Sequence, residues 1–254
     1  RLLTFLDGFT YEKVPDPRVA HAAGQLVGRF HRATADLAHR FAFVRVGVHD
    51  TAAHLAKLAR LLPTTNDAHT RALGERILAR AQTLPALGDV PERVAHGDLK
   101  ISNVLFCAPN PGGAAVARAL IDLDTLARLP LAVELGDALR SWCNPRAEDI
   151  AHTELNLDIL RAALTGYAET ARGLITRNEA QSLLPGLEII AVELAARFCA
   201  DAVEDCYFGW DAERFASRVE QNRVRAEGQL CLAQAVAKSR GAAETIVAEI
   251  DWGF

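Results

Sequence analysis

Apolar residues near the start of the chain recur every three or four positions, directly after Asp16 and Pro17. The apolar positions are Val19, Ala22, Ala23, Leu26, Val27 and Phe30. Asp and Pro are typical of a helix start. Asp can accept hydrogen bonds from the free N–H groups of the first turn, and Pro is tolerated there because an N–H at that position would have no partner in the helix. The spacing predicts an amphipathic helix over residues 17–40. Two more helices are expected at about 50–62 and 67–84, each after an Asp or Asn cap.

The pattern changes between Val90 and Leu131, where apolar runs become short and alternate with turn residues. The β-like runs are 93–95, 104–107 and 119–121. A turn signal, Pro109–Gly113, separates two of them. We therefore expect a small β element between two helical regions.

Helical patterns return after Glu134. Thr176 and Glu179 have the spacing of a capping box, in which each side chain bonds the other residue's backbone N–H. An apolar stripe follows, made of Leu187, Ile190, Ala191, Leu194, Ala195 and Phe198. A last helix is expected over about 211–238. The expected fold class is α+β, mainly helical, with one central β element.

The composition is that of an ordinary globular domain, with 50% of the 254 residues apolar and 24% charged. The formal net charge of -4 gives no basic field, so neither nucleic acid nor a membrane surface is an expected partner. No apolar run reaches the ~18 residues of a membrane span, and no signal peptide opens the chain. These features favour a cytoplasmic protein.

The cysteines point to the same compartment. They are Cys107, Cys143, Cys199, Cys206 and Cys231. Their number is odd and no two form a C-x-x-C pair, so reduced thiols are expected in preference to a disulfide or zinc role.

The chemistry of the chain is concentrated between His96 and Phe106. Asp98 and Asn103 are five residues apart, the spacing at which a kinase loop orients a substrate hydroxyl with Asp and binds magnesium with Asn. Lys100 lies two residues after Asp98, so in an extended loop it points to the same side and can contact the γ-phosphate. Asp122 follows across the expected hairpin and would supply a second metal ligand.

Asp124 lies two residues beyond Asp122 and, on a strand, would point to the same side, near metal or substrate. Each of these features is weak alone, because D-x-x-x-x-N matches arise by chance and His96 can be a structural histidine in a tight turn. The combination of strand, loop, strand, turn and second acidic pair favours a phosphoryl-transfer site.

Two segments, Asp98–Val104 and Ile121–Thr125, resemble the catalytic loop and the I-D-L-D-T motif of the aminoglycoside phosphotransferase-like kinases, which share the protein-kinase-like fold. The chain is most similar to the N-acetylhexosamine 1-kinase-like subgroup, although Ser102 stands where that subgroup often has Asn. Further matching segments are Gly28–Phe30, His49–Thr51, Gly136–Arg140, Ala147–Asp149, Arg197–Phe198 and Tyr207–Phe208. The resemblance covers residues 1–238.

The resemblance implies a role for each candidate residue. Asp98 would be the catalytic base with Lys100 beside it, and Asn103 and Asp122 would bind Mg²⁺ and, through it, ATP. The implied acceptor pocket consists of Asp124, Asp137, Arg140, Arg197 and Tyr207.

For three of the acceptor-pocket residues, the sequence leaves alternatives open. Arg140 lies three residues after Asp137 and can form a structural ion pair with it. Arg197 interrupts an apolar stripe, where it can serve a buried ion pair or contact a sugar. The aromatic run at 207–210 can line a sugar site or simply pack.

The resemblance also divides the chain. Residues 1–14 are similar to the hinge strand between kinase lobes, and residues 15–240 to the C-terminal lobe, with its catalytic loop at 96–107 and metal-binding strand at 119–125. Residues 241–254 form a tail of unknown role. No phosphate-covering loop or Walker motif precedes Asp98, and the chain starts without Met. We therefore expect the β-rich N-terminal lobe to be missing from this chain and to belong to the parent protein.

Two functions are consistent with these features. The first is an ATP- and Mg²⁺-dependent phosphotransferase acting on a hydroxyl of a small metabolite, such as an N-acetylhexosamine, with an aminoglycoside or amino alcohol as the alternative acceptor. On this hypothesis the 254-residue lobe alone is inactive. The second is a truncated, non-catalytic pseudokinase lobe that binds a metabolite or a partner.

Overall fold

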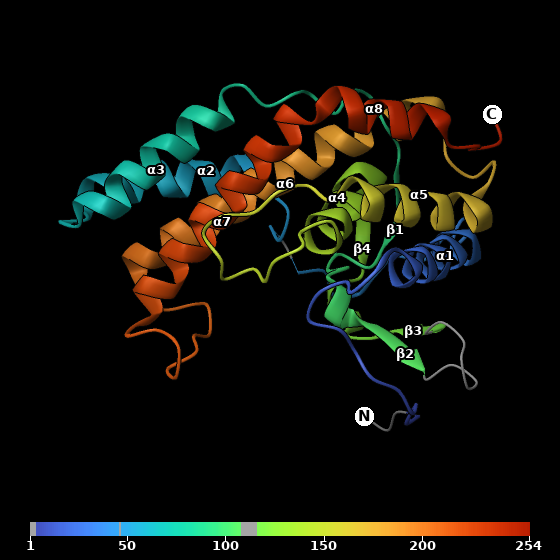
Figure 1. Ribbon diagram of the computed structural model, residues 1–254, viewed down its shortest axis with the longest axis horizontal. Helices are drawn as coiled ribbons and strands as arrows, with labels where there is room; N and C mark the ends of the chain where they lie inside the picture. Colours follow the sequence, from blue (N-terminus) through green and yellow to red (C-terminus); the bar gives the residue numbers. More distant parts are fainter. Residues whose placement is uncertain (1–3, 46, 108–115) are drawn as a thin grey trace.

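The computed structural model describes residues 4–45, 47–107 and 116–254. Its helices are α1 (Pro17–Ala33), α2 (Thr51–Leu61), α3 (Ala68–Ala81), α4 (Leu131–Trp142), α5 (Leu157–Ala171), α6 (Arg177–Glu204), α7 (Arg218–Lys238) and α8 (Arg240–Glu249). Its strands are β1 (Glu92–Ala95), β2 (Val104–Cys107), β3 (Val116–Leu120) and β4 (Ala127–Pro130), and its 3₁₀ turns are η1 (Leu62–Thr64), η2 (Ile101–Asn103) and η3 (Leu123–Thr125). The fold is mainly helical with a small β element, as expected (Figure 1).

The strands form two antiparallel ribbons within the described ranges. β1 pairs with β4, and β2 pairs with β3. Phe9 extends the second ribbon, because its backbone N–H and C=O each bond Phe106 at 2.8 Å. The pairing brings the loop between β1 and β2 beside the segment between β3 and β4.

The apolar helix faces form two clusters. One is built mainly on α1, α4, α5 and α8, the other mainly on α2, α3 and α7, and the long helix α6 contributes many residues to both. α1 and α5 pack so closely that glycines are required at the crossing: a Cβ at Gly24 would overlap the carbonyl of Ala163, and a Cβ at Gly166 would overlap that of His21.

The expected helices are present, but two have different limits. The helix expected over 17–40 ends at Ala33, where the Thr34 hydroxyl donates to the Phe30 carbonyl at 2.9 Å and closes the last turn. The helix expected from 211 begins at Arg218, because the Ser217 hydroxyl accepts the N–H of Glu220 and caps it. The capping box at the start of α6 is confirmed.

The strand expected over 119–125 is wrong in its second half. β3 ends at Leu120, and Asp122 adopts a left-handed conformation with φ 63° before η3 begins. Asp122 and Asp124 therefore do not alternate along one strand. β4 was not expected at all, and the turn expected at 109–113 lies outside the described residues.

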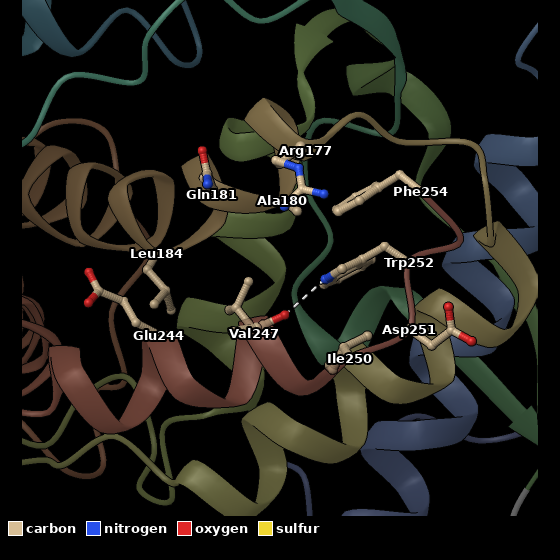
Figure 2. A pocket seen from close by; sticks show the side chains of 11 residues that line it. Arg177, Ala180, Gln181, Leu184, Glu244, Val247, Ile250, Asp251, Trp252 and Phe254 are labelled. Atoms are coloured by element: carbon tan, nitrogen blue, oxygen red, sulfur yellow. Dashed lines mark hydrogen bonds between the residues drawn. The ribbon is translucent and has the colours of Figure 1, made fainter.

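The tail packs against the body of the lobe. Residues 240–249 form α8, and Trp252, only 5% exposed, donates its indole N–H to the Val247 carbonyl at 2.9 Å. A cavity of about 670 Å³ lies between α6 and this segment, with the Arg177 guanidinium 5.0 Å from the Phe254 ring centre (Figure 2). None of the residues that line it comes from the 96–107 loop.

Two compositional expectations have structural counterparts. Across the described ranges, no helix is both long and apolar enough to cross a bilayer. All five cysteines are free, as expected. Burial raises the pKa of the Cys143 thiol, and it raises that of Cys199 to about 12, so these two thiols stay protonated.

Candidate active site

The site is built on the turn that follows β1. Gly97 has φ 81°, and a Cβ on it would lie 2.5 Å from the Thr125 carbonyl oxygen. The Thr125 hydroxyl donates to the His96 carbonyl at 2.7 Å. The turn is thus held directly against η3, at a backbone distance that only glycine permits.

A buried carboxylate holds the other side of the turn. Glu134 of α4 is fully buried and accepts the backbone N–H groups of His96 at 2.7 Å and Gly97 at 2.9 Å. His31 of α1 lies 3.3 Å from the same carboxylate and 3.1 Å from the Tyr167 hydroxyl. Helices α1, α4 and α5 therefore all contribute to the position of the turn.

Asp98 follows this turn and is half-buried. Its Oδ2 accepts the Lys100 ammonium at 2.7 Å and the Asn103 amide N–H at 3.0 Å. No described residue donates to Oδ1. Burial alone would lower the pKa of Lys100, but Asp98, with Asp122 and Asp137 nearby, outweighs it and the pKa is raised.

Asn103 and Asp122 come together through the backbone. The N–H of Ile121 donates to the Asn103 carbonyl at 3.0 Å, which places Asp122 next to the loop. The Asn103 NH₂ is used by Asp98, through both its carbonyl at 2.9 Å and its carboxylate, so the side-chain oxygen is the atom left for a cation.

These donors fit Mg²⁺, which takes one or two protein oxygens and completes its shell with water and phosphate oxygens. No cluster of three or more His, Cys, Asp or Glu side chains suited to a metal occurs in the part of the chain that the structure describes. The left-handed backbone of Asp122 is the kind of strain that accompanies functional positions.

A cavity of about 730 Å³ opens from Asp98 toward α6 and α7. Asp137, Arg140, Arg197 and Tyr207 line it, as does Lys100. Four of the five implied acceptor residues are therefore brought together.

The fifth, Asp124, is not on the cavity wall. It is exposed and forms an ion pair with Arg45 at 3.2 Å. The turn at Asp122 has directed it to the surface.

Arg140 is largely occupied by carboxylates. Its Nε and Nη2 donate to Asp137 Oδ1 at 3.1 and 2.9 Å, and its Nη1 donates to Glu148 at 2.8 Å. This geometry favours the structural ion pair. Asp137 Oδ2 is buried and accepts no hydrogen bond from the described residues, which leaves it available to a ligand. Burial would raise the pKa of Asp137, but Arg140 and His49 outweigh it and the pKa is lowered.

Some side chains among Arg197 and the aromatic run at 207–210 pack against other residues, and some line the cavity. Arg197 is 4.0 Å from Glu193 and lies over the Phe208 ring at 5.7 Å, with its guanidinium on the cavity wall. Phe208 packs on Phe198, with ring centres 4.5 Å apart, whereas Tyr207 is 66% exposed at the cavity mouth.

Sequence reasoning missed Glu134, Glu193 and Arg225. Glu134 and Glu193 are fully buried, and each sits among apolar neighbours in its helix. A carboxylate on a buried helix face was the available signal, since such groups stay buried only when paired. Arg225 of α7 lines the cavity and carried no signal of its own.

The lobe is mainly helical, and the loop between β1 and β2 holds Asp98, Lys100 and Asn103 together. This combination is that of a protein-kinase-like fold. The chain belongs to the phosphotransferase enzyme family, whose model matches residues 1–172.

Solved structures support the same fold. An aminoglycoside phosphotransferase from Alicyclobacillus acidocaldarius is similar with TM-score 0.56 and 19% identity, over 95% of this chain and 70% of that one. An ethanolamine kinase from Plasmodium vivax (TM-score 0.55, 12% identity) is matched over 92% of this chain and 65% of that one. A choline kinase from Cryptosporidium parvum (TM-score 0.52, 12% identity) is matched over 96% and 71%. The chain spans about two thirds of the length of these proteins.

Proposed function

We propose that the protein transfers a phosphoryl group from ATP to a hydroxyl of a small metabolite, with Asp98 as the base. The observation that carries this proposal is the asymmetry of the Asp98 carboxylate. Oδ2 accepts hydrogen bonds from Lys100 and Asn103, while Oδ1 accepts none from the described residues. Asp98 itself lines the large cavity.

In the proposed reaction, the acceptor hydroxyl donates to Asp98 Oδ1. Its oxygen attacks the γ-phosphorus, the bond from that phosphorus to the bridging oxygen breaks, ADP leaves, and the hydroxyl proton passes to Asp98. Lys100 offsets the charge of Asp98 and of the phosphoryl oxygens. Mg²⁺ bound by Asn103 and Asp122 would neutralise the charge of the phosphates.

The cavity wall favours a neutral sugar over a polycation as acceptor. It carries Arg45, Lys100, Arg140, Arg197 and Arg225 against Asp98, Asp137, Glu148 and Asp211. A site for a polycationic aminoglycoside needs an excess of acids, which this wall lacks. We therefore propose an N-acetylhexosamine-like acceptor, with Asp137 Oδ2 and Arg197 as its polar contacts.

We also propose that residues 1–14 are the hinge strand of a longer kinase and that its nucleotide-binding lobe is encoded upstream. A role in ATP-dependent metabolism and free thiols fit a cytoplasmic location. Reading the codons before Arg1 tests the upstream lobe directly.

The function itself is tested by incubating full-length protein with ATP, Mg²⁺ and a panel of sugars, aminoglycosides and amino alcohols, and measuring ADP. We expect turnover with an N-acetylhexosamine. Turnover with a cationic acceptor alone would overturn the proposed substrate class. Silence across the panel, with both lobes present, would overturn the phosphotransferase proposal in favour of a binding module.

A further inference from the structure

His49 contacts the Gly97 carbonyl of the turn that follows β1, whereas Glu134 holds the Gly97 N–H. It precedes α2, its side chain is 5% exposed, and it lines the cavity. Its Nδ1 is 3.1 Å from Glu193 Oε1 of α6, and its Nε2 is 3.1 Å from the Gly97 carbonyl oxygen. The residue thus links a fully buried carboxylate to the backbone next to Asp98.

The hydrogen-bond partners of His49 determine which of its ring nitrogens carry hydrogen. An ionised carboxylate and a peptide carbonyl can only accept, so both ring nitrogens must carry hydrogen. A neutral imidazole has one N–H and would leave a lone pair facing an oxygen. His96 shows the contrast: its Nε2 faces the Ile121 carbonyl, but its Nδ1 accepts the Asp98 N–H, so its partners call for hydrogen on only one ring nitrogen.

The charges around His49 support the doubly protonated form. On α6, it faces Glu193, and the Arg197 guanidinium is 4.0 Å from the same Glu193 carboxylate. From α4 it faces Asp137, and the loop brings Asp98 and Lys100 to the same cavity. Burial alone would lower the pKa of His49, but the bond to Glu193, then Asp137 and the Gly97 carbonyl, outweigh burial and raise it.

Glu193 is itself fixed. Its second oxygen accepts the Thr51 hydroxyl at 2.6 Å, so the carboxylate joins the start of α2 to the His49 ring. Gly97 is then held from both directions, with its N–H on Glu134 and its C=O on His49.

We propose that His49 is held as an imidazolium and acts as a positioning residue, fixing the Gly97 carbonyl and therefore the direction of Asp98. Its effect on turnover rests on the proposed phosphotransferase function, whereas its protonation state does not.

The first experiment reads the protonation directly. Two-bond ¹H–¹⁵N NMR spectra of the ¹⁵N-labelled 254-residue chain are recorded at about pH 7.5, one unit above the ordinary histidine pKa of about 6.5. The His49 signals are assigned by their loss in His49→Gln. We expect both ring nitrogens to show protonated shifts. One protonated and one bare nitrogen would overturn the proposal, whatever the enzyme does.

The second experiment tests positioning in full-length protein. Glu193→Gln removes the carboxylate, so the pKa of His49 should fall and the imidazolium should be lost as pH rises through neutrality. We expect its turnover to fall about tenfold on the alkaline side, through displacement of the turn, while wild type stays flat until higher pH. His21→Gln, at the exposed His21–Glu169 pair on α1, is the matched control and should follow wild type.

The two experiments fail in different ways. A Glu193→Gln pH profile that superposes on wild type would overturn the positioning role. If full-length wild type turns over no acceptor, the proposed function has failed, and the NMR result still decides the state of His49.

Discussion

Gly166 and Gly97 both occupy points where two backbones approach too closely for a side chain, yet the two regions around them are built differently. At Gly166, α5 crosses α1, and the contact depends on small volume and apolar neighbours. At Gly97, the approach to Thr125 also needs a left-handed backbone and polar partners, namely Glu134 on α4 and His49 in the loop before α2. The first region should respond to mutation in stability, and the second in turnover.

The largest effect is expected from Trp252→Ala, which removes a buried ring that lies 6.5 Å from Tyr167 of α5. Loss of such a ring costs about 3–5 kcal/mol in unfolding free energy. Urea unfolding of the chain measures it. Because no residue of the tail lines the active-site cavity, the folded fraction should keep its turnover, and a loss of turnover at full folding would break the comparison.

Gly97→Ala should show the opposite pattern. The new Cβ would meet the Thr125 carbonyl oxygen, and a residue other than glycine pays about 1–2 kcal/mol for the left-handed backbone. Displacing the turn by about 1 Å should lower kcat about 100-fold in full-length protein. Steady-state kinetics and urea unfolding are compared on the same sample. A stability loss with unchanged kcat would contradict the account.

Gly166→Ala should cost about 2 kcal/mol, since even one methyl group overlaps the His21 carbonyl and forces α1 and α5 apart. Thermal and urea unfolding measure the loss. Gly241→Ala on α8 is the control, because its Cβ would meet no atom within 4 Å. Equal stability of the two variants would show that the crossing has room to spare.

The smallest effect is expected from Asp201→Asn. The Asp201 carboxylate accepts the N–H groups of Cys206, Tyr207 and Phe208, at 3.1, 2.8 and 2.9 Å, and the Asn222 amide at 2.8 Å. Burial would raise its pKa, but these donors outweigh burial and lower it. Loss of the charge should cost about 1–2 kcal/mol near neutral pH.

The sign of this effect with pH follows from the lowered pKa. The contribution is fully present above the unfolded-state pKa of about 3.9 and is lost as pH falls through the lower folded-state pKa. The difference in urea midpoint between wild type and Asp201→Asn should therefore be smaller at about pH 2 than at about pH 7. A constant difference would mean that the carboxylate charge is not what holds the turn.

The helical part of the molecule could be predicted because its signals are local. The helical spacing of Val19, Val27 and their apolar neighbours predicted α1, and the capping box of Thr176 and Glu179 predicted the start of α6. The loop residues Asp98, Lys100 and Asn103 were also found locally, since their spacing alone brings them together.

What could not be predicted depends on contacts between distant parts of the chain. His49 and Glu193 are 144 residues apart, and neither residue's neighbours indicate the pairing. Asp122 was assigned to a strand because an alternating pattern does not reveal a single left-handed residue. The tail from Gly241 had apolar residues but no sequence signal for the surface that they cover.

The central claim is that Asp98 takes the proton of an acceptor hydroxyl during phosphoryl transfer. It is tested by single-turnover transfer from γ-labelled ATP to the acceptor in full-length protein, comparing wild type, Asp98→Asn and the exposed α5 control Asp158→Asn. We predict a rate about 10²–10⁴-fold lower for Asp98→Asn, with acceptor affinity nearly unchanged and the control at the wild-type rate. Transfer by Asp98→Asn at the wild-type rate would contradict the account.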